Sequence, residues 1–168
     1  MSLGPLERVD GRWVVGESRK PGGTWLEFRP DGLYQHARDS EGDLIPWSRV
    51  MLLGHCTVGA KYPRDTYGLK ALLDVLPGPW RGHGRGYLHM TLRHPYKDWA
   101  APFLLHPRWY RPTELVLLQE LLEQTGGAGE THRLGDAEWL SRVVERLEGQ
   151  RPRSARKIRE LVGEARGA

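Results

Sequence analysis

The sequence has a single cysteine among its 168 residues, so an intramolecular disulfide is excluded. Cys56 lies in an apolar run and is expected to be a buried small hydrophobe, which fits a reducing compartment. No run of 18 apolar residues is present, so no transmembrane helix is expected. The N-terminal residues carry early acidic side chains and no apolar core, so no signal peptide is expected. These features predict a cytoplasmic protein.

The sequence also lacks the short motifs of common catalytic sites, with no G-x-S-x-G, no P-loop and no G-x-G-x-x-G. Its seven histidines include no HExxH and no Cys/His ligand spacing. His89 and His94 flank one expected strand but fall on opposite faces of it, and His106 ends the partner strand. We therefore expect no enzyme, no metal and no cofactor. A small enzyme with a site near residues 77–94 remains an alternative.

The basic residues are unevenly distributed along the chain. Residues 133–168 contain nine Lys and Arg against six Asp and Glu, whereas residues 1–132 contain 16 against 15, and the chain has a net charge of +4. The first part of the chain is thus nearly neutral, and the excess lies in the last part. A mild basic excess permits contact with nucleic acid or anionic lipid but demands neither.

Alternating apolar residues and turn signals predict a β-rich region before residue 107. Residues 1–10 are expected to form a loose arm. Residues 67–76 have the apolar spacing of a short helix, although a strand also fits, and residues 77–86 are expected to be a loop. The expected strands are 11–17, 24–29, 33–38, 44–47 leading into 50–58, 87–94 and 99–106.

Three helices are expected after the strands. The first, 112–125, carries more leucines than a surface helix needs, so it is expected to cover an open face of the sheets. A Gly-rich linker, 126–135, follows, and Asp136 and Ser154 are placed to cap two further helices. The apolar stripes of these helices are Trp139, Leu140, Val143, Val144 and Leu147, and Ile158, Leu161, Val162 and Ala165. They must pack on each other, on the β-rich domain or on another chain. We favour packing on the same domain or on a second copy of the chain; the second case would give a homodimer through the tail.

Two stretches resemble bacterial members of the pleckstrin-homology-like (PH-like) superfamily. The first is GTWLEFRPDGLYQHARDSEGDLIPWSRVMLL, with its Asp-Gly hairpin and the spacing of Ile45, Trp47 and Val50; the second is YLHMTLRHPYKDWAAPFLLHP with the helix after it. The resemblance implies an α+β fold, an antiparallel β-sandwich or partly open barrel with a C-terminal capping helix. The domain would span 11–126, and 127–168 would be a linker and a two-helix hairpin tail. It also implies a binding module for phosphoinositides, anionic lipid or peptides, and not an enzyme.

Two loops offer candidate ligand-binding residues in this region. The resemblance implies that basic residues in the first hairpin loop grip phosphates, and Arg19 and Lys20 occupy the turn Ser18–Gly23. The second loop combines glycines with cationic and aromatic groups that can clasp an anion or stack on a base. Its candidate residues are Trp80, Arg81, His83 and Arg85. The plainer interpretation is a solvated turn in the first case and an insertion tip in the second.

The tail segment 150–159 holds basic residues without an acid, and such a segment can contact a phosphate backbone. Its candidates are Arg151, Arg153, Arg156, Lys157 and Arg159. The plainer interpretation is a docked helix with a solvated basic face. The sequence thus predicts a non-enzymatic binding or scaffold module of the bacterial cytoplasm that engages a protein partner or an anionic lipid headgroup. A nucleic-acid-associated protein is the alternative.

Overall fold

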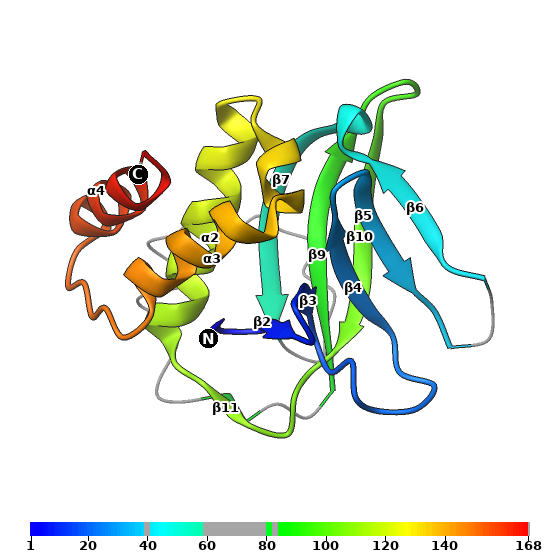
Figure 1. Cartoon of the computed structure of the whole chain (residues 1–168), viewed down its shortest axis with the longest axis horizontal. Coiled ribbons are helices and arrows are strands. Elements are labelled where there is room, and N and C mark those ends of the chain that lie inside the picture. Colours follow the sequence, from blue (N-terminus) through cyan, green and yellow to red (C-terminus); the bar gives the residue numbers. More distant parts are fainter. Residues whose placement is uncertain (39–40, 59–79, 82–83, 168) are drawn as a thin grey trace.

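The computed structural model describes residues 1–38, 41–58, 80–81 and 84–167, and within these ranges it is a mixed α+β structure (Figure 1). Strands of two antiparallel sheets lie on one side of the molecule, and helices lie on the other. This agrees with the α+β class that the sequence predicts. Residues 67–76, whose apolar spacing fits a helix or a strand, lie outside the described residues.

The larger sheet is a meander of six antiparallel strands in sequence order. Its strands are β1 (Ser2–Leu3), β2 (Leu6–Val9), β3 (Arg12–Val15), β4 (Trp25–Arg29), β5 (Gly32–His36) and β6 (Asp43–Pro46). The expectation of a loose N-terminal arm was therefore wrong. Leu3 and Leu6 are paired across a tight turn and are both fully buried, so this segment contributes to the core.

The smaller sheet has three strands in the order β10-β9-β7, and a short 3₁₀ turn, η1 (Trp47–Arg49), connects it to the meander. Its strands are β7 (Val50–Val58), β9 (Arg85–Leu92) and β10 (Lys97–Leu104). Leu88, Met90 and Leu92 are buried at alternate positions, as their sequence pattern predicts. Pro102 lies in β10, where an edge strand tolerates a missing N–H.

A third, two-stranded sheet corrects the expected loop at 77–86. Trp80 and Arg81 form β8 (Trp80–Arg81), which pairs with β11 (Trp109–Tyr110), and Arg85 already belongs to β9. The aromatic residues of these two short strands favour extended pairing over an open loop.

Main-chain hydrogen bonds join the two larger sheets where the β3–β4 connection meets the end of β10. The amide of Leu104 donates to the carbonyl of Thr24 at 2.8 Å, and the amide of Glu17 donates to the carbonyl of Leu104 at 2.9 Å. The amide of Leu105 donates to the carbonyl of Gly84 at 3.1 Å. The turn that carries Arg19 and Lys20 is thereby held against the start of β9.

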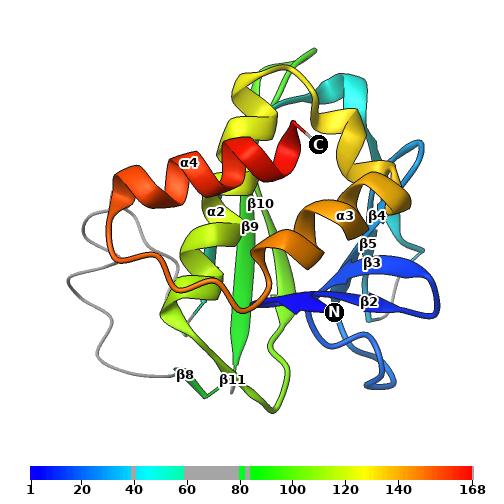
Figure 2. The same ribbon diagram turned by 60° about the vertical axis from the view of Figure 1, so that its left-hand side comes forward.

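The first helix, α2 (Pro112–Gly127), packs on β7. On its other side it contacts the last helix, α4 (Ala155–Arg166), as Figure 2 shows. Burial on both sides explains its leucine content, which exceeds that of a one-faced surface helix. Its buried aliphatic residues are Leu115, Val116, Leu117, Leu118, Leu121 and Leu122. The predicted covering role of this helix is confirmed.

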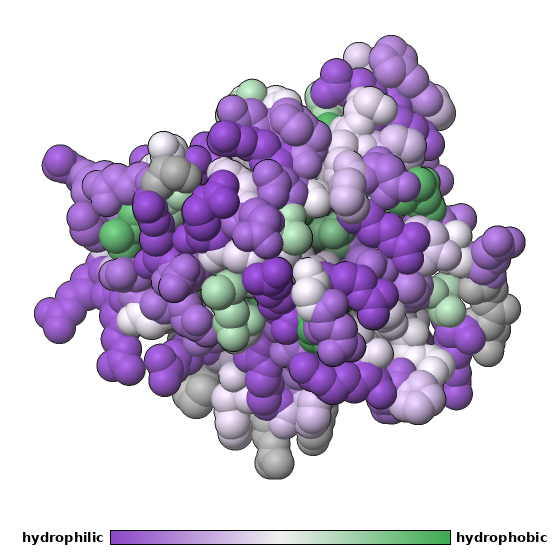
Figure 3. Space-filling view, viewed as in Figure 1, coloured by the Kyte–Doolittle hydropathy of each residue, from purple (hydrophilic) through white to green (hydrophobic). Residues whose placement is uncertain are grey.

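The two tail helices pack on their own chain. Asp136 caps α3 (Ala137–Leu147) by accepting from the amides of Glu138 and Trp139, and Ser154 caps α4 by accepting from the amide of Lys157, as predicted. Both apolar stripes join the same hydrophobic cluster as the sheets. Figure 3 shows a largely hydrophilic surface with only small apolar patches on the face that it presents. The stripes are therefore buried within the chain, and the homodimer through the tail stays a prediction.

Part of the expected Gly-rich linker is an ordered 3₁₀ helix, η2 (Thr131–Gly135). Leu134 and Gly135 are buried. A Cβ atom added to Gly135 would collide with the Arg29 carbonyl oxygen and lie 2.7 Å from Nε1 of Trp47. The glycine lets η2 approach the backbone of β4, which brings the start of α3 onto the meander.

We expect Gly135→Ala to lower the free energy of unfolding by about 1–3 kcal/mol, because the added methyl group overpacks a contact with main chain and indole. Gly127→Ala is the matched control, since a Cβ there meets nothing within 4 Å and alanine favours the helix. Urea denaturation of both variants measures the difference. Equal stability of the two variants would contradict the close docking of η2 on β4.

Candidate functional site

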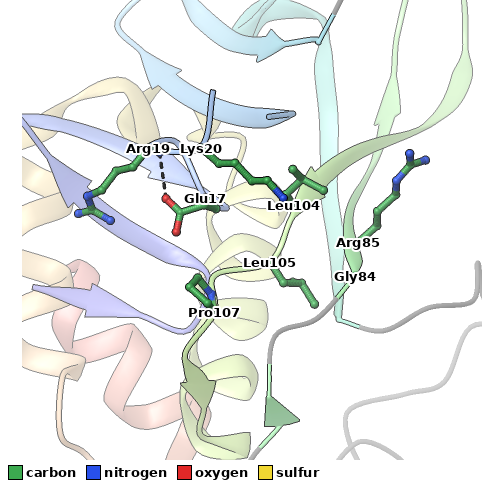
Figure 4. A pocket seen from close by; sticks show the side chains of 8 residues that line it. All are labelled: Glu17, Arg19, Lys20, Gly84, Arg85, Leu104, Leu105 and Pro107. Atoms are coloured by element: carbon green, nitrogen blue, oxygen red, sulfur yellow. Dashed lines mark hydrogen bonds between the residues drawn. The ribbon is translucent and has the colours of Figure 1, made fainter. Parts of the chain in front are cut away.

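A surface pocket of about 760 Å³ opens where the β3–β4 turn meets the ends of β9 and β10 (Figure 4). Three elements line it: the turn after β3, the start of β9, and the segment from the end of β10 to Pro107. Its volume lies within the range typical of small-molecule sites. The lining residues are Glu17, Arg19, Lys20, Gly84, Arg85, Leu104, Leu105 and Pro107.

The pocket brings together candidates that the sequence places in two separate loops. Arg19 and Lys20 come from the β3–β4 turn, and Arg85 comes from the first residue of β9. The turn is closed by the Gly23 amide, which donates to the Lys20 carbonyl at 3.0 Å. Figure 4 shows the Lys20 side chain reaching toward Leu104, with Arg85 on the far side of it. Both residues of the first predicted site thus line one pocket with Arg85 of the second.

The three cations of the pocket are not equivalent. The Arg19 guanidinium points away from Lys20 in Figure 4, and its Nη1 lies 2.8 Å from Oε1 of Glu7 on β2. Its charge is therefore partly compensated within the protein, because Glu7 also contacts Arg108 and the Arg19 side chain is 60% exposed. Lys20 and Arg85 form no ion pair with any residue in the described ranges. Glu17 contributes one negative charge to the wall, where its Oε1 accepts from the Arg19 amide at 2.9 Å.

A buried network stands behind Glu7. His106 Nε2 lies 3.3 Å from Oε1 of Glu7, without the alignment of a hydrogen bond, and Arg108 lies 3.7 Å from Oε2. The Tyr110 hydroxyl accepts from the His106 amide at 2.8 Å and lies 2.6 Å from Nδ1 of the same residue. The contacts with Tyr110 thus hold the His106 ring beside Glu7.

Burial dominates the titration of this network. It lowers the pKa of His106 and raises the pKa of Tyr110 to about 12. Both side chains are almost completely enclosed, so no substrate can reach them. We assign the network a structural role: it holds the Glu7 carboxylate in place, and Glu7 in turn holds Arg19.

A second buried carboxylate lies on β4. Glu27 Oε2 accepts from Arg29 at 2.9 Å and contacts Nε2 of His36 at 2.9 Å, and the His36 ring stacks on Trp25 with centroids 3.5 Å apart. Burial alone would raise the pKa of Glu27, but the hydrogen bonds from Arg29 and His36 outweigh it and lower that pKa. Burial also lowers the pKa of His36. Because these groups satisfy one another, the cluster offers no group to a ligand.

The other candidates fall into two groups, one outside the described residues and one on the tail. His83 and the side chains of Trp80 and Arg81 fall outside the described residues. The basic residues of the tail are all exposed, and two of them share Glu160 as a partner on α4. These five are Arg151, Arg153, Arg156, Lys157 and Arg159. Arg156, Lys157 and Arg159 lie on the docked helix α4, and Arg151 and Arg153 lie in the connection before it.

Sequence reasoning missed the negative and apolar parts of the site. Glu7 lies in the segment expected to be a loose arm, yet the apolar residues Leu3 and Leu6 just before it were a signal of a strand. Leu104 and Leu105 were placed in a strand, without a reason to associate them with Lys20. Only the main-chain bonds between the sheets reveal that association.

Comparison with known proteins finds no matching protein family, no similar curated protein and no similar solved structure. In the described part of the chain, no helix combines the length and apolar character needed to cross a membrane. The site must therefore be interpreted from its own chemistry.

We expect the free energy of unfolding to fall as the pH drops below 6.5, the ordinary pKa of histidine, because the folded-state pKa values of His36 and His106 are lower. The unfolded chain then binds more protons, and each group contributes a slope of up to about 1.4 kcal/mol per pH unit. Protonation of Glu27 lowers the free energy of unfolding further below pH 4.5, the ordinary pKa of its carboxyl group, because its folded-state pKa is lower. Urea denaturation from pH 7.5 to 5 measures the first effect.

His106→Gln removes one of the two histidines and should flatten this dependence. His132→Gln is the control, because His132 is exposed on η2, and its profile should match the wild type. A His106→Gln profile as steep as the wild type would show that the buried network does not titrate in this range.

Proposed function

We propose that the protein is a non-enzymatic binding module of the bacterial cytoplasm that binds an anionic lipid headgroup in this pocket. The observation that carries the proposal is the convergence of Lys20 and Arg85, which are remote in sequence and have no ion-pair partner among the described residues. An anion placed between them gains two charge-assisted contacts. The same chemistry would accept an acidic side chain of a protein partner, which the experiment below distinguishes.

The order of the elements supports a PH-like interpretation of the fold. A meander is followed by a three-stranded antiparallel sheet and then by a helix that packs on it. Arg19 and Lys20 lie in the connection between β3 and β4, the first long turn of the meander. In PH-like proteins this order accompanies binding of lipid or peptide, and fold likeness alone does not assign a ligand.

We expect the wild type to sediment with vesicles that contain phosphatidylglycerol and not with phosphatidylcholine alone. Lys20→Gln/Arg85→Gln should reduce binding at least tenfold, because it removes both unpaired cations. Arg151→Gln/Arg153→Gln is the matched control, with the same change in charge on the exposed tail. Equal losses in both variants would indicate non-specific attraction to the membrane. No vesicle binding by the wild type would reject the lipid ligand in favour of a protein partner.

Nucleic acid is the second candidate, and it is favoured by the exposure of the five basic tail residues. If the tail binds duplex DNA, the logarithm of the association constant should fall linearly with the logarithm of the salt concentration, with a slope near −0.9 per contacted phosphate. Arg151→Gln/Arg153→Gln should then reduce that slope, whereas Lys20→Gln/Arg85→Gln should leave it unchanged. Fluorescence anisotropy from 50 to 200 mM salt measures it, and no binding at 50 mM removes this candidate.

A further inference from the structure

The charge of the pocket fits a singly charged ligand. Arg19 shares Glu7 with Arg108, and the charged lining groups without an ion-pair contact in the described ranges are Lys20, Arg85 and Glu17. Two positive charges and one negative charge leave an excess of one. A headgroup with several phosphates would bring more negative charge than this lining can compensate, and it would also be repelled by the Glu17 carboxylate.

An apolar wall lies beside the cations, with Leu104 next to the end of Lys20 (Figure 4). It consists of Leu104, Leu105 and Pro107, and three of its main-chain polar groups are already used. The Leu104 amide and carbonyl bond to Thr24 and Glu17, and the Leu105 amide bonds to Gly84. A ligand therefore meets hydrocarbon there, with few partners for hydroxyl groups. A polyol such as an inositol ring would lose hydrogen bonds to water without replacing them.

We propose that the pocket takes an amphipathic monoanion. A single carboxylate or phosphodiester head lies between Lys20 and Arg85, and an aliphatic body lies along Leu104, Leu105 and Pro107. This inference rests on the proposed function, and it narrows the ligand from any anionic headgroup to one with a single charge and an adjacent hydrocarbon chain. Such a ligand occurs either as a free fatty acid or as a lipid within a bilayer.

Isothermal titration calorimetry on the full chain tests this with decanoate below its micellar concentration, against acetate and inositol 1,4,5-trisphosphate. We expect decanoate to bind at least tenfold tighter than acetate, because each buried methylene adds to affinity, and tighter than the trisphosphate. Decanoate should also displace the protein from phosphatidylglycerol vesicles if both sources use this pocket. Binding of decanoate without such displacement would assign the pocket to the free acid.

Two sets of variants test separately the contacts of the charged head and of the aliphatic body of the ligand. Lys20→Gln/Arg85→Gln should weaken decanoate binding at least tenfold, and Leu104→Gln or the shorter Leu104→Ala should do the same through the apolar wall. Leu44→Gln is the matched control, because Leu44 is an exposed leucine on β6, outside the pocket. Circular dichroism checks that each variant is folded.

The outcomes distinguish this inference from the function on which it rests. If the trisphosphate binds and decanoate does not, the anion site stands and the amphipathic ligand is rejected. If decanoate binds equally to Leu44→Gln, Leu104→Gln and Lys20→Gln/Arg85→Gln, it adsorbs elsewhere and the inference is rejected. If neither decanoate, trisphosphate nor anionic vesicles bind, the inference and the lipid-binding function both fall.

Discussion

The attachment of the β3–β4 turn to the end of β10 is the constraint on which the site depends. Two main-chain hydrogen bonds at Leu104, one to Thr24 and one from Glu17, connect the six-stranded meander to the three-stranded sheet. Such bonds depend on backbone position and are insensitive to which side chains project from the turn. They let the turn carry exposed cations at no cost to the junction. Without this attachment, Lys20 and Arg85 would belong to separate loops.

The N-terminal strands also affect the charges around the pocket. They place Glu7 in the core, where an isolated carboxylate would be costly to bury. Arg19, Arg108 and His106 surround it, and the Tyr110 hydroxyl orients the histidine. The site thus contains one arginine whose guanidinium stabilises the fold while its side chain lines the pocket. In the sequence, Arg19, Lys20 and Arg85 are equivalent candidates. In the structure, Arg19 contacts Glu7, whereas Lys20 and Arg85 have no ion-pair partner among the described residues.

Local patterns predicted much of the fold and little of the site. Capping residues and apolar stripes predicted the helices at 137–147 and 155–166, because these signals depend on residues within one or two helical turns. Period-two alternation likewise predicted the strand that contains Leu88. The N-terminal strands were missed although they pair locally, β1 with β2 and β2 with β3. The 3₁₀ helix η2 was missed because it packs on Arg29 and Trp47, which are distant in the sequence. The same holds for the pocket, whose β3–β4 turn is more than 60 residues from its other two segments.

The two basic surfaces of the molecule differ in how strongly they can hold an anion. The tail cations are exposed, so salt screens them and their contacts are weak individually. Lys20 and Arg85 lie beside an apolar wall, where fewer waters compete and the effective dielectric constant is lower. The protein compensates its buried carboxylates, Glu7 and Glu27, with cations of its own. An added anion therefore gains the most binding free energy at the pocket, where Lys20 and Arg85 lie beside apolar side chains.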